Sequence, residues 1–257
     1  MTDIFATHYA DIRAAGGRDE LTGRLKDEGL ATFSGVTDRA SLLNLAHGLL
    51  TLYLHRDSDP DGVTVITSGA EDSQPGFAGF SSAGLHPHTE RSGVAEPPRL
   101  VMLCCITPAA SGGASQLVDG ARLYQEVALA DPAMLHILTA PRSAFFGGAA
   151  GYLGSVFENA DAGRMTIRFR LDDLAQFSPE VTQVLPLLTS LIREHVSTAD
   201  LGRGEGFVLD NTRWLHGRSR YTGSRIMLRI LGNPLPALAL QRGFATSTAT
   251  SDEHVHA

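Results

Sequence analysis

The chain has 257 residues, of which 43% are hydrophobic, and it carries a formal net charge of −7 with a pI near 5.8. This length and composition predict one large domain with a sizeable core, which we assign to residues 1–240. The negative charge and the lack of any long Lys/Arg run argue against a nucleic-acid partner, so we expect the partner to be a small molecule.

Two cysteines, Cys104 and Cys105, are adjacent within the apolar run 100–106. Neighbours in a strand point to opposite faces, so we expect two buried thiols in a reducing compartment and no disulfide. The amino terminus lacks a basic region followed by an apolar one, and no segment approaches about 18 uninterrupted apolar residues. The sequence therefore predicts a cytoplasmic protein with no membrane partner.

The first part of the chain alternates helical and strand patterns. Residues 4–30 place apolar side chains at helical spacing, broken at Gly16–Gly17, which predicts two short helices. Residues 31–36 read as a strand, and Asp38 is a candidate cap for a helix running through Leu52.

A strand at 63–67 is followed by the loop 68–84, which is rich in Gly, Ser and Ala and contains Phe80. A long loop of this kind is often a lid or a substrate wall, although a disordered connector fits the composition equally well.

The middle of the chain continues this alternation. Residues 99–106 form a nearly continuous apolar run, as expected for a strand buried on both faces, and Gly112–Gly113 turns the chain into a second strand. Residues 124–138 predict a helix interrupted near Asp131–Pro132. Ser178 followed by Pro179 is typical of a helix start.

Short strands joined by Gly/Pro turns and flanked by a few helices predict a mainly β fold, a sandwich or barrel wrapped in helices. The C-terminal core adds a hairpin over 206–221 that carries His216, and one more strand at 225–231. The Thr/Ser/Ala-rich tail, residues 241–257, is predicted to be disordered.

The segment 85–93 contains the most distinctive local pattern, because His86, His88 and Glu90 occupy alternate positions. In an extended backbone, positions two apart project from the same side roughly 6.5 to 7 Å apart, so His88 and Glu90 are able to hold one ion. Pro87 favours extended backbone at this point. An H-x-E tripeptide alone is a weak signal, and a second histidine elsewhere is needed to complete a two-histidine, one-carboxylate iron site.

Arginine side chains recur on the late strands. Arg225 and Arg229 share one face of the strand 225–231, and Arg168 and Arg170 share one face of the predicted strand 164–170. A buried guanidinium needs an anionic partner, because an unpaired buried charge costs several kcal/mol. An acidic ligand and a structural carboxylate of the protein are both candidates for that partner.

Taken together and in this order, the motifs resemble the TauD/TfdA superfamily of Fe(II)- and 2-oxoglutarate-dependent dioxygenases over roughly residues 80–232. The matching segments are His88-Thr89-Glu90, Pro97-Pro98, Gly112 to Ser115, Asn211 to Arg218, and Arg225 to Arg229. Glutamate in place of the commoner aspartate is similar to the clavaminate-synthase-like branch, whose members mostly oxidise amino acids. The resemblance implies a double-stranded β-helix core, a jelly roll of the cupin-like kind.

The resemblance also implies roles for individual residues. His88, Glu90 and His216 match the iron ligands, and Arg225 and Arg229 match an arginine pair of which one member holds the distal carboxylate of 2-oxoglutarate. Ser115 stands where the family usually has a threonine that contacts the co-substrate. Which arginine of the pair is used stays open at this stage.

The implied activity uses Fe(II), 2-oxoglutarate and O2 to hydroxylate an unactivated C–H of a small polar metabolite, an amino acid or an amino-acid-derived natural-product intermediate. Desaturation or cyclisation, and a sulfonate or nucleotide substrate, are alternatives with the same iron chemistry. A non-catalytic, cupin-like metal- or ligand-binding module is the alternative of another class. The candidate substrate-contacting residues are His86, Phe80, Arg168, Arg170 and Arg218.

Overall fold

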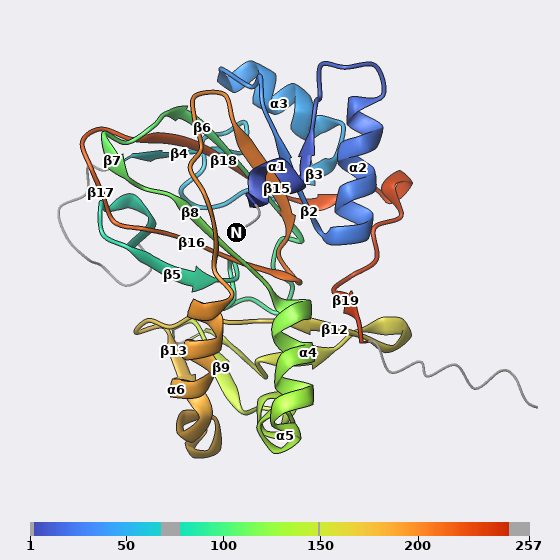
Figure 1. The fold of residues 1–257 in the computed structure, drawn as a ribbon, viewed down its shortest axis with the longest axis vertical. Helices are drawn as coiled ribbons and strands as arrows, with labels where there is room; N and C mark the ends of the chain where they lie inside the picture. Colours follow the sequence, from blue (N-terminus) through green and yellow to red (C-terminus); the bar gives the residue numbers. More distant parts are fainter. Residues whose placement is uncertain (1–2, 68–77, 149, 247–257) are drawn as a thin grey trace, which may run out of the picture.

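Two antiparallel β-sheets form the centre of the molecule in the computed structural model, which describes residues 3–67, 78–148 and 150–246 (Figure 1). The major sheet has seven strands and is antiparallel except for the first pair. Its order is β1 (Tyr9–Ala10), β2 (Leu30–Phe33), β15 (Gly206–Asp210), β6 (Leu100–Thr107), β18 (Ile226–Pro234) and β3 (Leu50–Leu52), with β4 (Val63–Thr67) also paired to β18.

The minor sheet has four strands and holds the H-x-E motif at its edge. Its order is β14 (Ser197–Ala199), β8 (Ser115–Asp119), β16 (Trp214–Arg218) and β5 (Leu85–His88). The short pair β7 (Ser111–Gly112) and β17 (Tyr221–Thr222) extends the turn regions beside β8 and β16.

The two sheets face each other across a shared apolar cluster. Leu117 and Trp214 from the minor sheet pack with Val101, Phe207 and Leu231 from the major sheet. Period-two alternation then points their neighbours to the outer faces. These facing sheets with helices outside confirm the predicted mainly β, double-stranded β-helix fold.

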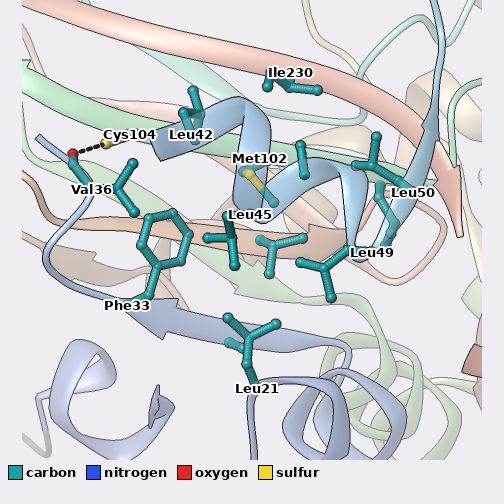
Figure 2. Close-up of a cluster of buried hydrophobic side chains, with 14 of the residues drawn as sticks. Leu21, Phe33, Val36, Leu42, Leu45, Leu49, Leu50, Met102, Cys104 and Ile230 are labelled. Atoms are coloured by element: carbon teal, nitrogen blue, oxygen red, sulfur yellow. Dashed lines mark hydrogen bonds between the residues drawn. The ribbon is translucent and has the colours of Figure 1, made fainter. Parts of the chain in front are cut away.

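Helices α2 (Gly17–Glu28) and α3 (Arg39–His47) lie on the major-sheet side of the molecule (Figure 1). The short helix α1 (Ile4–Thr7) instead places Ile4 in the apolar cluster between the two sheets. Figure 2 shows Leu42 and Leu45 of α3 packed with Phe33 and Met102 of the sheet. Cys104 belongs to this cluster and donates from Sγ to the carbonyl of Val36 at 3.0 Å, and burial raises the pKa of its thiol to about 12. Both cysteines are free and buried, as predicted.

A second group of helices covers the outer face of the minor sheet: α4 (Gly120–Ala130), α5 (Pro132–Thr139) and α6 (Pro179–Glu194). Asp131 accepts from the Met134 amide and Ser178 from the Val181 amide, so each caps the helix that follows it. Two small three-stranded sheets lie at this end, β10 (Tyr152–Gly154) with β9 (Ala144–Phe146) and β13 (Ala175–Phe177), and β11 (Phe157–Asn159) with β12 (Arg164–Ile167) and β19 (Phe244–Ala245). Single 3-10 turns are η1 (Ala78–Phe80), η2 (Asp161–Gly163) and η3 (Pro236–Leu238).

Two predicted elements are shorter in the structure than the sequence pattern suggests. The helix after Asp38 ends at His47, and Leu50–Leu52 is strand β3, because these residues pair with the end of β18. Strand β12 ends at Ile167, because the Phe169 main chain pairs with Thr89 instead.

The described part of the chain contains no helix long and apolar enough to cross a membrane. Residues 241–246 of the predicted tail are described, and Phe244 is buried in strand β19, whereas residues 247–257 lie outside the described residues.

Candidate metal and co-substrate site

His88, Glu90 and His216 come together between the two sheets. Strand β5 pairs with β16 so that His88 lies opposite His216, and the ring centroids of the two histidines are 4.5 Å apart. One potential ligand atom from each of the three residues lies within 4.8 Å of the others. His216 Nε2 is 3.8 Å from Glu90 Oε2. The two segments that the sequence linked only by residue type therefore meet in one compact cluster.

Glycine at position 217 makes this approach of β5 to β16 possible. A Cβ at Gly217 would lie 2.5 Å from the Leu85 carbonyl oxygen and 2.8 Å from the Pro87 nitrogen. Real side chains do not tolerate such distances, so any other residue would push the H-x-E strand away from His216.

The ring of His88 is oriented by the main chain of its own strand. Its Nδ1–H donates to the His86 carbonyl at 2.9 Å, which leaves Nε2 with a free lone pair. Burial, followed by the nearby His216, lowers the pKa of His88 to about 4. A neutral imidazole is the form that binds a metal, so His88 is suited to act as a ligand at neutral pH.

Hydrogen bonds hold the Glu90 main chain, and an arginine forms an ion pair with its carboxylate. Asn211 clamps it from both sides, because the Glu90 amide donates to Asn211 Oδ1 at 2.6 Å and Asn211 Nδ2 donates to the Glu90 carbonyl at 2.9 Å. Burial alone would raise the pKa of Glu90, but Arg229 and the two histidines outweigh it and hold the pKa well below its ordinary value. Glu90 is therefore an anion in the folded protein.

Asn211 holds the Glu90 main chain, a contact that the sequence did not reveal. It is 1% exposed, and Nδ2 also donates to the Pro98 carbonyl at 2.9 Å. The partners of Asn211 are separated from it by more than a hundred residues, so no local pattern predicts these contacts. Asn211 appeared in the sequence only as one residue of a segment that resembles the family.

The two arginines after His216 have different partners. Arg229 donates from Nη1 to Glu90 Oε2 at 2.8 Å. Arg225 is 5% exposed, and it donates from Nη2 to the Gly113 carbonyl at 3.3 Å, with the Tyr221 ring centroid 5.5 Å from its guanidinium carbon. Burial, followed by Arg218, lowers the pKa of Arg225 to about 10, so it remains a cation at neutral pH. Among the described residues no carboxylate pairs with Arg225.

These groups open into one cavity of about 660 Å³, a volume typical of small-molecule sites. Its wall includes the three clustered residues, both arginines and Ser115, which is 2% exposed. The structure thus brings together every residue to which the sequence assigned the metal or the co-substrate.

Four of the five candidate substrate residues line this cavity: Phe80, His86, Arg170 and Arg218. The His86 side chain is exposed, although its carbonyl orients His88. Arg170 forms a two-pronged pair with Asp172, from Nε to Oδ1 at 2.7 Å and from Nη2 to Oδ2 at 2.5 Å.

Arg218 and Arg168 instead bind main-chain carbonyls on either side of the H-x-E strand. Arg218 donates to the carbonyls of Gly79, Ser81 and Ala83 at 2.6–3.0 Å. Arg218 also lines the cavity, and its guanidinium carbon is 4.9 Å from the Tyr221 ring centroid. This arginine therefore ties the segment before the motif to the cavity wall.

Arg168 binds the main chain of the segment that follows the motif. Its guanidinium donates to the carbonyls of Ser92, Val94 and Ala95 at 2.6–3.1 Å and covers the Tyr152 ring at 3.9 Å. Arg168 does not line the cavity in the described part of the chain.

His55, which lies in the connection between β3 and β4, is also part of the cavity wall. Its side chain is 8% exposed, and Nδ1 is 3.3 Å from Asp57 Oδ2. Burial, followed by Arg229, lowers the pKa of His55. Its sequence neighbours do not reveal this position, because the cavity wall is assembled from segments that are distant in the chain.

The comparison with known proteins agrees with the geometry. The profile of the taurine catabolism dioxygenase TauD, TfdA family matches residues 4–231. The chain belongs to this family. Its members are Fe(II)- and 2-oxoglutarate-dependent dioxygenases, which confirms the family, the cofactor and the co-substrate predicted from the sequence.

Curated relatives share a limited identity with this family member. Gamma-butyrobetaine dioxygenase of Homo sapiens is 24% identical over 232 residues, covering 81% of this chain and 57% of the relative. Uridine-5'-phosphate dioxygenase of a Streptomyces species is 23% identical over 201 residues, covering 71% of this chain and 73% of the relative. The chain thus spans little more than half the length of the human enzyme.

Solved structures show the same fold. Asparagine oxygenase superposes with a TM-score of 0.69 at 19% identity, covering 90% of this chain and 85% of that one. The non-heme iron oxygenase OrfP, solved with Fe and alpha-ketoglutaric acid, superposes with a TM-score of 0.64 at 14% identity, covering 86% and 80%.

The residues of this chain fit an iron(II) ion. Two imidazoles and one ionised carboxylate form the donor set that suits a non-heme iron with positions left open for other ligands. His88 presents Nε2 because Nδ1 is engaged, and the buried Nδ1 of His216 has no partner among the described residues.

Proposed function

We propose that the protein is an Fe(II)/2-oxoglutarate-dependent oxygenase that hydroxylates an unactivated C–H of a small polar metabolite, with an amino acid or amino-acid-derived compound as the substrate. The observation that carries the proposal is one cavity in which a His/Glu/His cluster lies beside a buried arginine that has no carboxylate partner among the described residues. Family membership and the likeness to oxygenases solved with hydroxylated asparagine and arginine support it.

His88, Glu90 and His216 hold the metal, and Arg225 receives the distal carboxylate of 2-oxoglutarate. Arg229 is already engaged by Glu90 at 2.8 Å, whereas Arg225 is buried with one weak contact to a carbonyl, so Arg225 has the greater need of an anion. Ser115, in the same wall, supplies a hydroxyl to the co-substrate. When bound, iron and 2-oxoglutarate supply the oxidising chemistry, in which O2 is consumed and succinate and CO2 are formed.

An anaerobic titration tests these roles. Iron(II) and 2-oxoglutarate added to the folded protein should produce a weak visible charge-transfer band, and His216→Ala should abolish it. Arg225→Gln should weaken 2-oxoglutarate binding by at least tenfold with little change in metal binding, since it removes a charge-assisted contact worth about 1.5–3 kcal/mol. Arg220→Gln, at an exposed arginine, is the matched control.

Other results of these experiments would contradict the proposed roles. A well-folded protein without the band would contradict the oxygenase proposal and favour a ligand-binding module. An Arg225→Gln variant with unchanged 2-oxoglutarate affinity, together with a weakened Arg229→Gln variant, would move the distal carboxylate to Arg229. Succinate formation with a screened substrate distinguishes catalysis from binding alone.

A nucleotide substrate is the second candidate, with the same iron chemistry. The relation to a uridine-5'-phosphate dioxygenase supports it. Mass analysis of products in the same screen, run with nucleotides beside amino acids, separates the two.

A further inference from the structure

The charges around the cavity are unequal in number. Among the described residues, the lining contains the arginines Arg56, Arg91, Arg170, Arg218, Arg225 and Arg229, but only the carboxylates Asp57, Glu90 and Asp172. Each carboxylate already has an arginine: Glu90 pairs with Arg229 at 2.8 Å, Asp172 with Arg170 at 2.5 Å, and Asp57 with Arg56 at 3.5 Å. Three arginines of the wall therefore have no carboxylate within the described structure.

Two of these three are accounted for. Arg218 donates to three main-chain carbonyls, and Arg225 is the residue proposed for 2-oxoglutarate. The remaining arginine is Arg91, which directly follows the metal motif. Its Nε is buried and has no hydrogen-bond partner in the part of the chain that the structure describes, and its Nη1 is 3.5 Å from His55 Nε2, a long and weak contact.

The backbone of Arg91 is unusual for its residue type. It has a φ of 55°, the left-handed region that non-glycine residues rarely adopt. The surroundings enforce it, because Asn211 clamps Glu90 on one side while Arg168 binds the Ser92 and Val94 carbonyls on the other. Strain of this kind persists only where surrounding contacts impose it, and it occurs most often at functional sites.

His55 adds a second polar group at the same place. Its Nε2 faces Arg91, while its Nδ1 lies 3.1 Å from the Asp57 amide nitrogen and 3.3 Å from Asp57 Oδ2. At 3.5 Å, Nε2 is a poor acceptor for Arg91, so an oxyanion in the cavity would satisfy the Arg91 guanidinium better, and it would also accept from His55 when Nε2 carries the proton.

We propose that Arg91 and His55 form an anion-binding subsite for the primary substrate, which therefore carries a carboxylate or a phosphate in addition to its reacting C–H. This inference rests on the proposed function, because it counts Arg225 as occupied by 2-oxoglutarate. It narrows the substrate class to anionic or zwitterionic metabolites and excludes purely neutral or cationic ones.

The test is calorimetric titration of the protein loaded anaerobically with iron(II) and saturating 2-oxoglutarate, with acetate and with methyl phosphate as probes. We expect saturable binding of at least one probe with one site per chain, and an affinity at least tenfold lower in Arg91→Gln. Binding of acetate alone or of both probes indicates a carboxylate substrate, and binding of methyl phosphate alone indicates a phosphate. The dissociation constant of 2-oxoglutarate should stay unchanged in the variant.

Arg142→Gln is the matched control, because Arg142 is also a left-handed arginine, with φ of 60°, but it is exposed and outside the cavity lining. It should bind the probes as the natural protein does. Arg91→Gly separates a binding role from a structural one, since glycine accepts the left-handed backbone without strain. This variant should lose probe binding while its Tm stays the same or rises.

Three results would overturn the inference: no saturable binding of either probe, equal binding in Arg91→Gln, or a lowered Tm with retained binding in Arg91→Gly. The charge-transfer band is recorded first in every sample. If the band forms and the probes do not bind, the subsite is wrong and the proposed function stands. If the band does not form, the proposed function fails and the subsite falls with it.

Discussion

At the scale of single residues, the site depends on side chains that bind main-chain groups as much as on those that face the cavity. Asn211 holds the amide and the carbonyl of Glu90, and the His86 carbonyl orients the His88 ring. Such contacts fix ligand atoms before any metal arrives, which lowers the ordering that metal binding must supply.

Asn211→Asp tests this arrangement with almost no change of shape. Aspartate still accepts from the Glu90 amide but no longer donates to the Glu90 and Pro98 carbonyls, and it places a second buried anion beside Glu90. We expect the free energy of unfolding to fall by about 2–4 kcal/mol and metal affinity to fall at least tenfold. Urea denaturation and metal titration measure the two effects.

Asn44→Asp, on the exposed face of α3, is the control because it adds the same charge away from the cavity. If the Asn211→Asp variant binds the metal as tightly as the natural protein does, then the Asn211 side chain does not position Glu90.

At the scale of elements, the site forms because β5 crosses close to β16 and because the segments flanking β5 are tied down. Arg218 binds carbonyls before the strand and Arg168 binds carbonyls after it. Both arginines were candidates for substrate contact on sequence grounds, and their guanidinium groups are instead largely used by the backbone. A substrate contact by either stays a prediction.

Gly217→Ala is expected to separate the two strands. The added methyl would lie 2.5 Å from the Leu85 carbonyl oxygen, so β5 must move and carry His88 away from His216. Overpacking of this kind costs about 1–3 kcal/mol, and metal affinity should fall at least tenfold. Thermal unfolding and metal titration report the two effects.

Gly23→Ala provides the contrast, since no atom lies within 4 Å of a Cβ there and the residue is inside helix α2. That variant should be more stable by up to about 1 kcal/mol with unchanged metal binding. Tight metal binding in Gly217→Ala would mean that the strand approach does not determine the site.

The start of α3 is tied to the turn before β4 by an ion pair whose strength depends on pH. Arg39 donates to Asp61 at 2.6 Å, and this bond lowers the pKa of Asp61 below its ordinary value of 3.8. A lowered carboxyl pKa contributes stability above the unfolded value, and that stability is lost as the pH falls through the folded value. The window is therefore below about pH 4.

Arg39→Gln should lower the free energy of unfolding by about 0.5–1 kcal/mol at pH 7, since the pair is partly exposed and screened by solvent. The difference from the natural protein should shrink as the pH falls below about 4. Urea denaturation at several pH values measures it, with Arg203→Gln, at an exposed arginine, as control. A difference that is the same at pH 7 and pH 3 would rule out this linkage.

At the scale of the whole molecule, the cavity lies between two sheets that are each covered by helices on the outside. The major sheet supplies Arg229 and the minor sheet supplies Ser115 and His216, so a ligand in the cavity contacts both layers. Binding to the folded state alone then stabilises the entire fold by mass action.

Iron(II) at about 100 times its dissociation constant should add roughly 2.7 kcal/mol to the free energy of unfolding. For a chain of this size, that corresponds to a rise in Tm of about 5–10 °C, measured anaerobically by calorimetry. His216→Ala should show little or no rise. The same rise in the natural protein and in His216→Ala would place the stabilising metal elsewhere.

The sequence by itself determined the features that depend on local pattern. Alternation placed His88 with Glu90, and Arg225 with Arg229, on common faces, because side-chain direction in a strand follows a period of two. Capping chemistry placed the starts of α3 and α6. The order of the motifs identified the family, and with it iron and 2-oxoglutarate.

Only the tertiary structure decided how the charged groups are shared. Arg229 reaches Glu90 across 139 positions of the chain, and Arg168 reaches Ser92 across 76, so no local pattern records these pairs. The buried cations compete for a few carboxylates, and the outcome depends on distance and burial. That competition leaves Arg225 and Arg91 without anions among the described residues, one beside the co-substrate position and one directly after the H-x-E motif.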